Sequence, residues 1–324
     1  MSVPVMAGDG SFTKVVSQLA VGDGTIGLGI PIGSTITYLN DGTTEVTRPG
    51  NSMVLKAVDS ETATVSTPEG PTIATHVCEV PSGTLIVDSG NVVKAYLNNS
   101  LILTVVNQQK TAAQSIPPPT IPNPNWIECD WDTGIKADYN GVYWTVPHFP
   151  TGHSNWCTDY IFNGEGPVLG GTIIQPVLAW TNGSWTGTDW YVYNGGKIKT
   201  EDMPVNEGDL IREEMFYEGN NSWIITFTDV STGYFRVLPV QTNFGPDKWF
   251  GQQVYWTLEG YSITSNNDVS DNIYFTNISL KRNGNAISHS FHPEVNHSGF
   301  PMLTGLSVTS SGQTADTLHT ANNP

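Results

Sequence analysis

The sequence is poor in positively charged residues. Its 324 residues include 13 Lys and Arg against 30 Asp and Glu, which gives a formal net charge of −17. Nucleic-acid binding depends on cationic side chains that neutralise phosphates, so this balance argues against a nucleic-acid partner. An anionic membrane surface is disfavoured for the same reason. Charged residues make up only 13% of the chain, which suits a protein that works in acid.

Long hydrophobic runs and cysteine pairs are also missing. No stretch approaches the ~20 apolar residues that a membrane-spanning helix needs, so no membrane span is expected. The first ten residues lack the basic and apolar regions of a secretory signal peptide. Cys78, Cys129 and Cys157 have no Cys-x-x-Cys spacing, which makes a zinc site an unfavoured interpretation. Cys129 and Cys157 could form a disulfide, and the alternative is three buried thiols.

Helical periodicity is almost absent. The best helical candidate, residues 12–21, is short, and elsewhere short alternating runs are separated by turn residues every ~8–12 positions. Residues 36–47 and 91–107 each read as a β-hairpin, the first with Asn-Asp-Gly at its turn. The pattern therefore predicts an all-β protein.

A proline-rich segment divides the chain. Residues 115–125 hold five prolines in eleven positions, which excludes a helix or a central strand and indicates a stiff linker. We therefore predict a β-rich N-terminal module over residues 1–114 and a larger β-domain over 126–306. The final residues, 307–324, are rich in Ser, Thr and Gly and are expected to form a flexible tail.

The larger domain holds most of the tryptophans and at least eight candidate strands. Their number and alternation predict a two-sheet antiparallel β-sandwich. The candidate strands are residues 141–147, 158–163, 171–180, 189–194, 208–219, 222–230, 252–263 and 272–282.

Two strands each carry a lone polar group of catalytic type. With a period of two, Gln175 projects from one face of residues 172–180, and Glu259 projects from one face of residues 254–261. An ionised carboxylate can take a proton from water and return it to a leaving amine. A glutamine amide can donate to the oxyanion of a tetrahedral intermediate. The alternative is structural: Gln175 satisfies a neighbouring backbone group, and Glu259 lies in an exposed concavity.

Seven segments, in order, resemble the fungal glutamic peptidases, or eqolisins. They are YWTVP (143–147), TIIQPVLAW (172–180), DWYVYNGG (189–196), MPVNEGDLI (203–211), ITFTDVSTG (225–233), VYWTLEGY (254–261) and IYFTNISL (273–280). The similarity covers residues 125–281. It implies an eqolisin-like, concanavalin-like β-sandwich, an acid endopeptidase activity without a cofactor or metal, and secretion. The family's catalytic glutamine and glutamate fall on Gln175 and Glu259.

The resemblance also suggests substrate-binding residues, and it has departures. Trp190, Tyr191 and Tyr255 are candidate walls of a substrate groove. An acidic residue of the family's Trp-Tyr-Glu-Trp segment is Val192 here, and the aspartate of its Gly-Ile-Asp-Gly turn is Asn163. These changes put the pH optimum, the specificity and activity itself in question.

Asp189 lies near Val192 in the sequence and is a candidate replacement for the missing acid, and Asn163 is kept as a candidate substrate contact. The residue after the glutamine is Pro176, which removes a donor from the strand ladder.

The sequence thus favours an acid endopeptidase that takes a polypeptide substrate. One alternative is a non-catalytic sandwich whose aromatic groove holds a glycan or peptide. Another is a glycosidase, which would need a second carboxylate ~5–10 Å from Glu259. His289, His292 and His297 with Glu294 could bind a metal, but a solvated loop is the favoured interpretation. The N-terminal module is interpreted as a pro-domain, a binding module or a stabilising partner.

Overall fold

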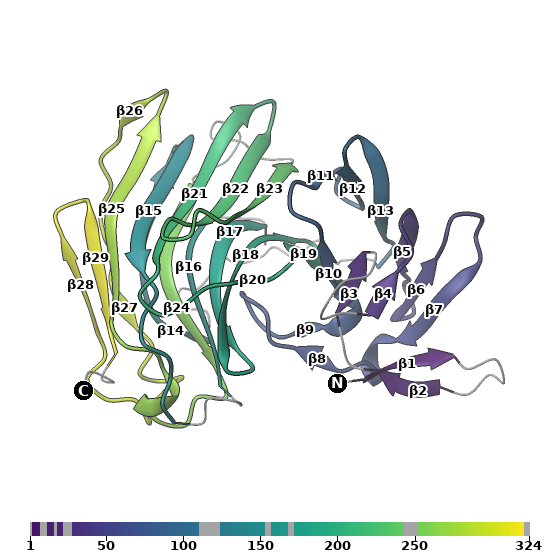
Figure 1. Cartoon of the computed structure of the whole chain (residues 1–324), viewed down its shortest axis with the longest axis horizontal. Helices are drawn as coiled ribbons and strands as arrows, with labels where there is room; N and C mark the ends of the chain where they lie inside the picture. Colours follow the sequence, from purple (N-terminus) through teal and green to yellow (C-terminus); the bar gives the residue numbers. More distant parts are fainter. Residues whose placement is uncertain are drawn as a thin grey trace.

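The computed structural model describes residues 2–6, 12–15, 18–21, 28–109, 124–152, 157–167, 172–242 and 252–320. Two large β-sheets face each other and form a sandwich (Figure 1). Helical structure in the described residues is limited to three single-turn 3₁₀ segments, at Asp59–Glu61, Ala74–His76 and Asn266–Asp268. None of the described residues forms a helix that is long and apolar enough to cross a membrane. The prediction of an all-β sandwich is confirmed.

The first sheet, called the Glu259 sheet below, has eleven strands. Their order is β27-β14-β24-β16-β17-β18-β19-β10-β3-β4, and β20 also pairs with β18. The bounds are β3 Leu19–Val21, β4 Leu28–Ile30, β10 Val77–Val80, β14 Trp126–Ile135, β16 Thr158–Pro167, β17 Ile173–Thr181, β18 Ser184–Tyr193, β19 Gly196–Thr200, β20 Met203–Pro204, β24 Gln252–Tyr261 and β27 Glu294–Val295.

The second sheet has fourteen strands, in the order β28-β29-β25-β15-β21-β22-β23-β11-β12-β13-β5-β6-β7, with β26 beside β25. The bounds are β5 Ser34–Tyr38, β6 Thr43–Thr47, β7 Met53–Val58, β11 Leu85–Asp88, β12 Val92–Leu97, β13 Ser100–Asn107, β15 Tyr139–Thr145, β21 Leu210–Gly219, β22 Ser222–Asp229, β23 Phe235–Gln241, β25 Ile273–Arg282, β26 Asn285–Ala286, β28 Ser307–Ser311 and β29 Ala315–His319. Two small hairpins stand apart, β1 Ser2–Met6 with β2 Phe12–Val15 and β8 Thr64–Val65 with β9 Thr72–Ile73.

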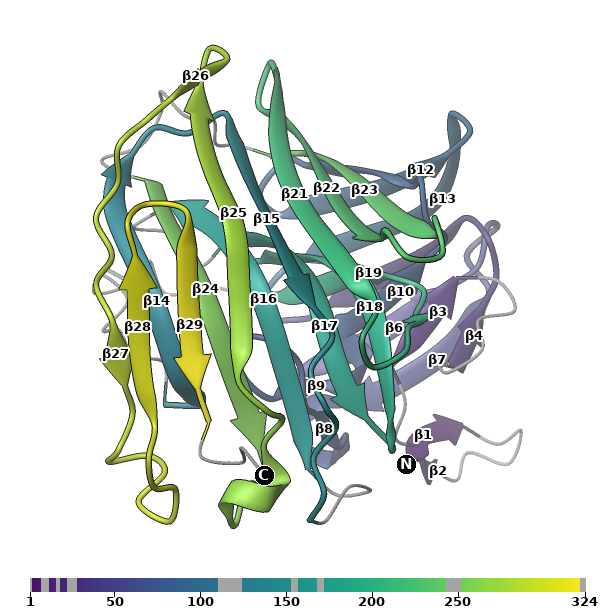
Figure 2. The same cartoon turned by 60° about the vertical axis from the view of Figure 1, so that its left-hand side comes forward.

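Strands from both sides of the proline-rich segment share these sheets. β10 pairs in parallel with β19, and β11 pairs in parallel with β23. The N-terminal strands β3–β7 and β10–β13 therefore extend the two large sheets (Figures 1 and 2). The linker itself stays a prediction, because residues 110–123 lie outside the described part of the chain.

Two predictions of local structure are wrong. The candidate helix at 12–21 contains the strands β2 and β3 instead. The expected flexible tail forms β28 and β29, and β29 pairs with β25 through Ile273 and Leu318. Leu318 is fully buried, and its burial explains why a Ser- and Thr-rich segment is ordered.

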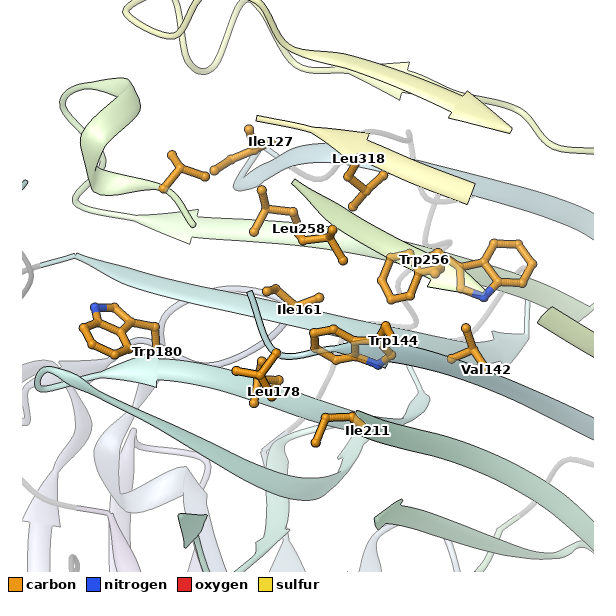
Figure 3. Packing of buried hydrophobic residues seen from close by; sticks show 14 of the residues in the cluster. Ile127, Val142, Trp144, Ile161, Leu178, Trp180, Ile211, Trp256, Leu258 and Leu318 are labelled. Carbon is orange, nitrogen blue, oxygen red and sulfur yellow. The ribbon is translucent and has the colours of Figure 1, made fainter. Parts of the chain in front are cut away.

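The main core lies between the two sheets. It contains Trp144, Trp256, Phe227 and Phe275, together with aliphatic residues from both sheets (Figure 3). A second cluster joins residues of the N-terminal strands to residues of β17–β19 and β21–β23. A third, smaller cluster lies on the other face of the Glu259 sheet. Because side chains alternate along a strand, Trp256 faces the main core and its neighbours Tyr255 and Thr257 face this second surface. That surface carries the candidate site.

Candidate functional site

Glu259 projects from β24 on the face that turns away from the main core. Tyr160 of β16 and Trp126 of β14 are its partners on the two neighbouring strands. The Glu259 side chain is completely buried, with 0% of its surface exposed. A carboxylate in such a place is costly unless it is hydrogen-bonded or protonated. The expectation of an exposed concavity is therefore wrong.

Two groups hold the Glu259 carboxylate. The backbone N–H of Glu69 donates to Oε2 at 3.0 Å, and the Tyr261 hydroxyl makes a short contact with Oε1. Burial raises the pKa of Glu259 to about 7, and the hydrogen bonds from Tyr261, Glu69 and Gly70 and the charge of Lys197 limit the rise. A carboxyl group with a pKa near 7 can both accept and donate a proton in mild acid.

Glu69 belongs to a turn from the N-terminal half that lies over this face. Residues 66–71, called the covering turn below, connect β8 and β9. In Figures 1 and 2 this hairpin lies between the N-terminal strands and strands β16 to β18. Glu69 has a φ of +69° and Gly70 a φ of +111°. A non-glycine residue in this region costs roughly 1–2 kcal/mol, so the contacts with the sheet must outweigh that strain.

The covering turn is bound mainly through its backbone carbonyls. The Tyr160 hydroxyl donates to the carbonyl of Ser66 at 2.8 Å, and the Tyr261 hydroxyl lies 3.1 Å from the carbonyl of Thr67. Lys197 Nζ donates to the carbonyl of Pro68, to the carbonyl of Gly70 at 3.1 Å and to Thr67 Oγ1 at 2.7 Å.

Lys197 itself is 6% exposed, and burial lowers its pKa to about 8. A segment of peptide therefore occupies the surface around Glu259.

Gln175 projects from the same face of the sheet as Glu259. Val177, two residues after Gln175, is the partner of Phe162, and Phe162 is the partner of Thr257, two residues before Glu259. Gln175 is completely buried, and neither atom of its amide has a hydrogen-bond partner in the described part of the chain. The structure thus gives no hydrogen bond between Gln175 and Glu259. The structural alternative, an amide that satisfies a neighbouring backbone group, is also not what the structure shows.

Two of the five candidate substrate-binding residues lie on the Glu259 face. Trp190 is the partner of Gln175 on the next strand, and its indole N–H donates to Thr188 Oγ1 at 2.7 Å. Tyr255 packs edge-on against Trp126, with 5.3 Å between the ring centroids. Both side chains are buried in the third cluster.

The other three candidates point to the opposite face. Tyr191 follows Trp190 directly, so it faces the other way, and its hydroxyl donates to Asp88 at 2.6 Å. Asn163 accepts a hydrogen bond from Asn140 between the sheets. Asp189 is buried, and burial raises its pKa while the charge of Arg236 opposes the rise. The structure therefore does not bring these three residues together with Glu259.

Sequence reasoning missed the residues that contact the covering turn. Tyr261 carries a signal that could have been read, because it lies two positions after Glu259 and so shares its face. Tyr160 lies within a predicted strand, but nothing in its surroundings marks it. Lys197 and Glu69 have no local signal, because Glu69 is 190 positions away from Glu259 in the sequence.

The structure also places the histidines and cysteines that were considered as metal ligands or as a disulfide pair. Among the described residues, no group of three or more His, Cys, Asp or Glu could hold a metal ion. His289 is buried beside Trp256 and Phe291 rather than in a solvated loop. All three cysteines are free and buried, which is the alternative to a Cys129–Cys157 disulfide. Cys129 belongs to the third cluster and Cys157 to the main core, so the sheet separates them.

The tryptophans give little support to a glycan-binding surface. A recess of about 530 Å³ is lined by Phe149, Trp180 and Trp185 among others. Trp180 and Trp185 are only 5% and 4% exposed, and Phe149 stacks on Trp180. The recess is on the main-core side of β17 and β18, away from Glu259. In the described part of the chain, no pair of exposed coplanar tryptophans is present, and Trp156 and Trp249 lie outside it.

Comparisons with known proteins give a likeness of fold. No family model matches the sequence, and no curated protein matches it. Among solved structures, scytalido-glutamic peptidase with a transition-state analogue inhibitor is similar at 17% identity over 60% of this chain and 98% of that chain, with a TM-score of 0.43. SCP-B, an eqolisin-family peptidase in complex with the tripeptide Ala-Ile-His, is similar at 17% identity over 60% of this chain and 98% of that chain, with a TM-score of 0.42.

Aspergilloglutamic peptidase from Aspergillus niger is similar at 16% identity, over 52% of this chain and 100% of that chain, with a TM-score of 0.33. At this level the likeness concerns the β-sandwich and assigns no role to any residue.

Proposed function

We propose that the chain is a glutamic-type acid endopeptidase in which Glu259 activates water. The observation that carries the proposal is the contact of the buried Glu259 carboxyl group with a peptide group, in which the backbone N–H of Glu69 donates to Oε2 at 3.0 Å. This contact supports a role for Glu259 beside a bound peptide. The likeness to glutamic peptidases in fold and in sequence segments is consistent with it. The carboxylate would take a proton from the attacking water and then return it to the leaving amine.

Gln175 is proposed as the second member of the site. Its amide is buried on the Glu259 face without a hydrogen-bond partner among the described residues, which costs stability and leaves both polar atoms available for a ligand. It could donate to the developing oxyanion or orient the water. No step of this mechanism needs a metal or a cofactor, and the substrate class is polypeptide. Secretion remains a proposal that rests on the family resemblance.

The second candidate is a peptide-binding module without catalysis. It is favoured by the missing hydrogen bond between Gln175 and Glu259 and by the complete burial of both side chains. A bound peptide would then be held but not cut.

Casein digestion separates the two candidates once the Glu259 face is open. In the turn-shortened variant, residues 66–71 are replaced by Asn-Gly, which can close the β8–β9 hairpin as a two-residue turn. We expect it to cleave denatured casein between pH 2 and 7. Glu259→Gln should lower the rate by a factor of about 10²–10⁴, while Glu218→Gln, at an exposed position, should not. A folded turn-shortened variant without activity would favour the binding module.

A further inference from the structure

The covering turn presents one particular peptide bond to the site. The bond between Pro68 and Glu69 has its N–H on Glu259 Oε2 at 3.0 Å. Its carbonyl oxygen accepts a hydrogen bond from Lys197 Nζ. An acid–base group thus contacts the nitrogen and a cation contacts the oxygen of the same bond. In peptide hydrolysis these are the two atoms that must gain a proton and a negative charge.

Lys197 is unlike its neighbour on the same face of β19. Lys199 forms ion pairs with Asp202 and Glu79 and so is neutralised by carboxylates. The contacts of Lys197 are two backbone carbonyls and one hydroxyl of the covering turn, and no ion pair of Lys197 within 4.0 Å occurs among the described residues. The charges of Glu69 and Glu259 also favour the ammonium form of Lys197. Burying an ammonium group is costly unless its donors are satisfied, and the three groups that accept its hydrogen bonds all belong to the covering turn, so this lysine depends on a peptide for its hydrogen bonds.

We propose that Lys197 is a third catalytic residue of the Glu259 site, which binds the carbonyl of the substrate peptide bond and stabilises its oxyanion. The covering turn occupies this position as an internal substitute for a substrate. The inference rests on the proposed peptidase function, and it adds a residue that the sequence resemblance does not supply. Gln175 makes no hydrogen bond to the described residues of the turn, whereas Lys197 donates to the carbonyl oxygen directly.

The chemical step balances without another reactant. Water attacks the carbonyl carbon while Glu259 takes its proton, and the carbonyl oxygen becomes an oxyanion beside the Lys197 ammonium. The C–N bond then breaks, the carbonyl reforms and Glu259 gives its proton to the leaving nitrogen. The products are a carboxylic acid and an amine. In the covering turn, Glu259 contacts the peptide nitrogen directly, which leaves the attacking water no place between them.

A binding measurement tests the Lys197 contact without relying on cleavage. A synthetic hexapeptide with the sequence of residues 66–71, Ser-Thr-Pro-Glu-Gly-Pro, is titrated into the turn-shortened variant by calorimetry. We expect Lys197→Met to weaken binding at least tenfold and Lys94→Met, at an exposed position, to leave it unchanged. A folded turn-shortened variant that does not bind the peptide, or binds it equally well after Lys197→Met, overturns the proposal.

Kinetics test the oxyanion role in the same background. We expect Lys197→Met to lower kcat by a factor of about 10²–10³, with a much smaller change in KM, and Lys197→Arg to restore part of kcat. A change confined to KM would overturn the oxyanion role. Peptide binding that depends on Lys197 but is accompanied by no hydrolysis would refute the peptidase function and the oxyanion step and keep the carbonyl contact.

If the turn-shortened variant does not fold, the intact chain still gives a test. Hydrogen exchange of the amides of Thr67, Glu69 and Gly70 should become faster in Lys197→Met than in Lys94→Met, while exchange in β24 stays unchanged. Equal acceleration in both regions would show that Lys197 has only a general structural role.

Discussion

Single residues show where stability and function are opposed. Gln175 places both polar atoms of its amide in a buried position without a partner, and Glu259 is buried beside a cation and two backbone N–H groups. A fold that served stability alone would place apolar side chains at these positions. This cost is shared with other parts of the sandwich, because both carboxylate oxygens of Glu128 and Asp189 are also buried without a hydrogen-bond partner among the described residues. What distinguishes Gln175 and Glu259 is that both project from one face of the same sheet.

Replacement of Gln175 therefore has opposite effects on stability and activity. Gln175→Met removes an unsatisfied amide and keeps a similar volume, so we expect the free energy of unfolding to rise by about 1–3 kcal/mol. In the turn-shortened background, the same change should lower the rate of peptide cleavage at least tenfold. Urea unfolding and a peptide assay measure the two effects. A loss of stability with unchanged activity would mean that the Gln175 amide makes stabilising hydrogen bonds in the folded chain and has no role in catalysis.

At the scale of strands, alternation was the reliable signal. It predicted β15–β18, β21, β22, β24 and β25, and it placed Gln175 and Glu259 on strands. It missed β14, because Glu128 and Asp130 look like surface residues in the sequence although both are buried. Alternation also places Trp190 on the opposite face from Asp189 and Tyr191, so the prediction that grouped these three residues in one groove did not follow the pleat.

The sequence could not predict the covering turn over the site. Its contacts with Glu259, Tyr160 and Lys197 join positions 94 to 190 residues apart, and they consist mainly of backbone carbonyls and one backbone N–H. Backbone groups are the same in every residue, so no side-chain pattern marks them. The sequence was therefore sufficient for the sandwich and for the two candidate polar residues, but not for what covers them.

The C-terminal hairpin offers a test of packing at this scale. Leu318 on β29 is completely buried in the main core, as Figure 3 shows beside Leu258. We expect Leu318→Ala to lower the free energy of unfolding by about 2–5 kcal/mol. Leu101→Ala, at a position that is 42% exposed, should cost much less. If both substitutions had equally small effects on the free energy of unfolding, the result would support the flexible tail that the composition predicted.

The whole molecule buries many carboxyl groups and few cations. Burial raises the pKa of Glu128 to about 9, of Asp130 and Asp159 to about 8, and of Asp316 to about 7. The charge of Asp316 also raises the pKa of Asp130, whereas the hydrogen bond with Asp130 limits the rise at Asp316. The unfolded chain loses these protons near pH 4. Between that pH and pH 7–9 the folded chain holds more protons than the unfolded chain.

Stability should therefore be highest in acid and fall as the pH rises from about 4 to about 9. Each such carboxyl group lowers the free energy of unfolding by up to about 1.4 kcal/mol per pH unit, until the pH reaches its pKa in the folded chain. Urea unfolding at pH 4.5, 6, 7.5 and 9 measures the trend. Glu128→Gln keeps the shape of the side chain but removes its titrating proton, so it should make the decrease in the free energy of unfolding smaller. A free energy of unfolding that stays level or rises over this range would contradict the account.

The most direct test of the central claim is a two-by-two comparison of cleavage rates at pH 6.5, close to the pKa of Glu259, where part of its carboxyl is ionised. A fluorogenic peptide is incubated with the intact chain and the turn-shortened variant, each with Glu259 and with Glu259→Gln. We predict that shortening the turn raises the rate and that Glu259→Gln abolishes the rise. A turn-shortened variant that is folded and cleaves equally well after Glu259→Gln would contradict the assignment of Glu259 as the residue that activates water.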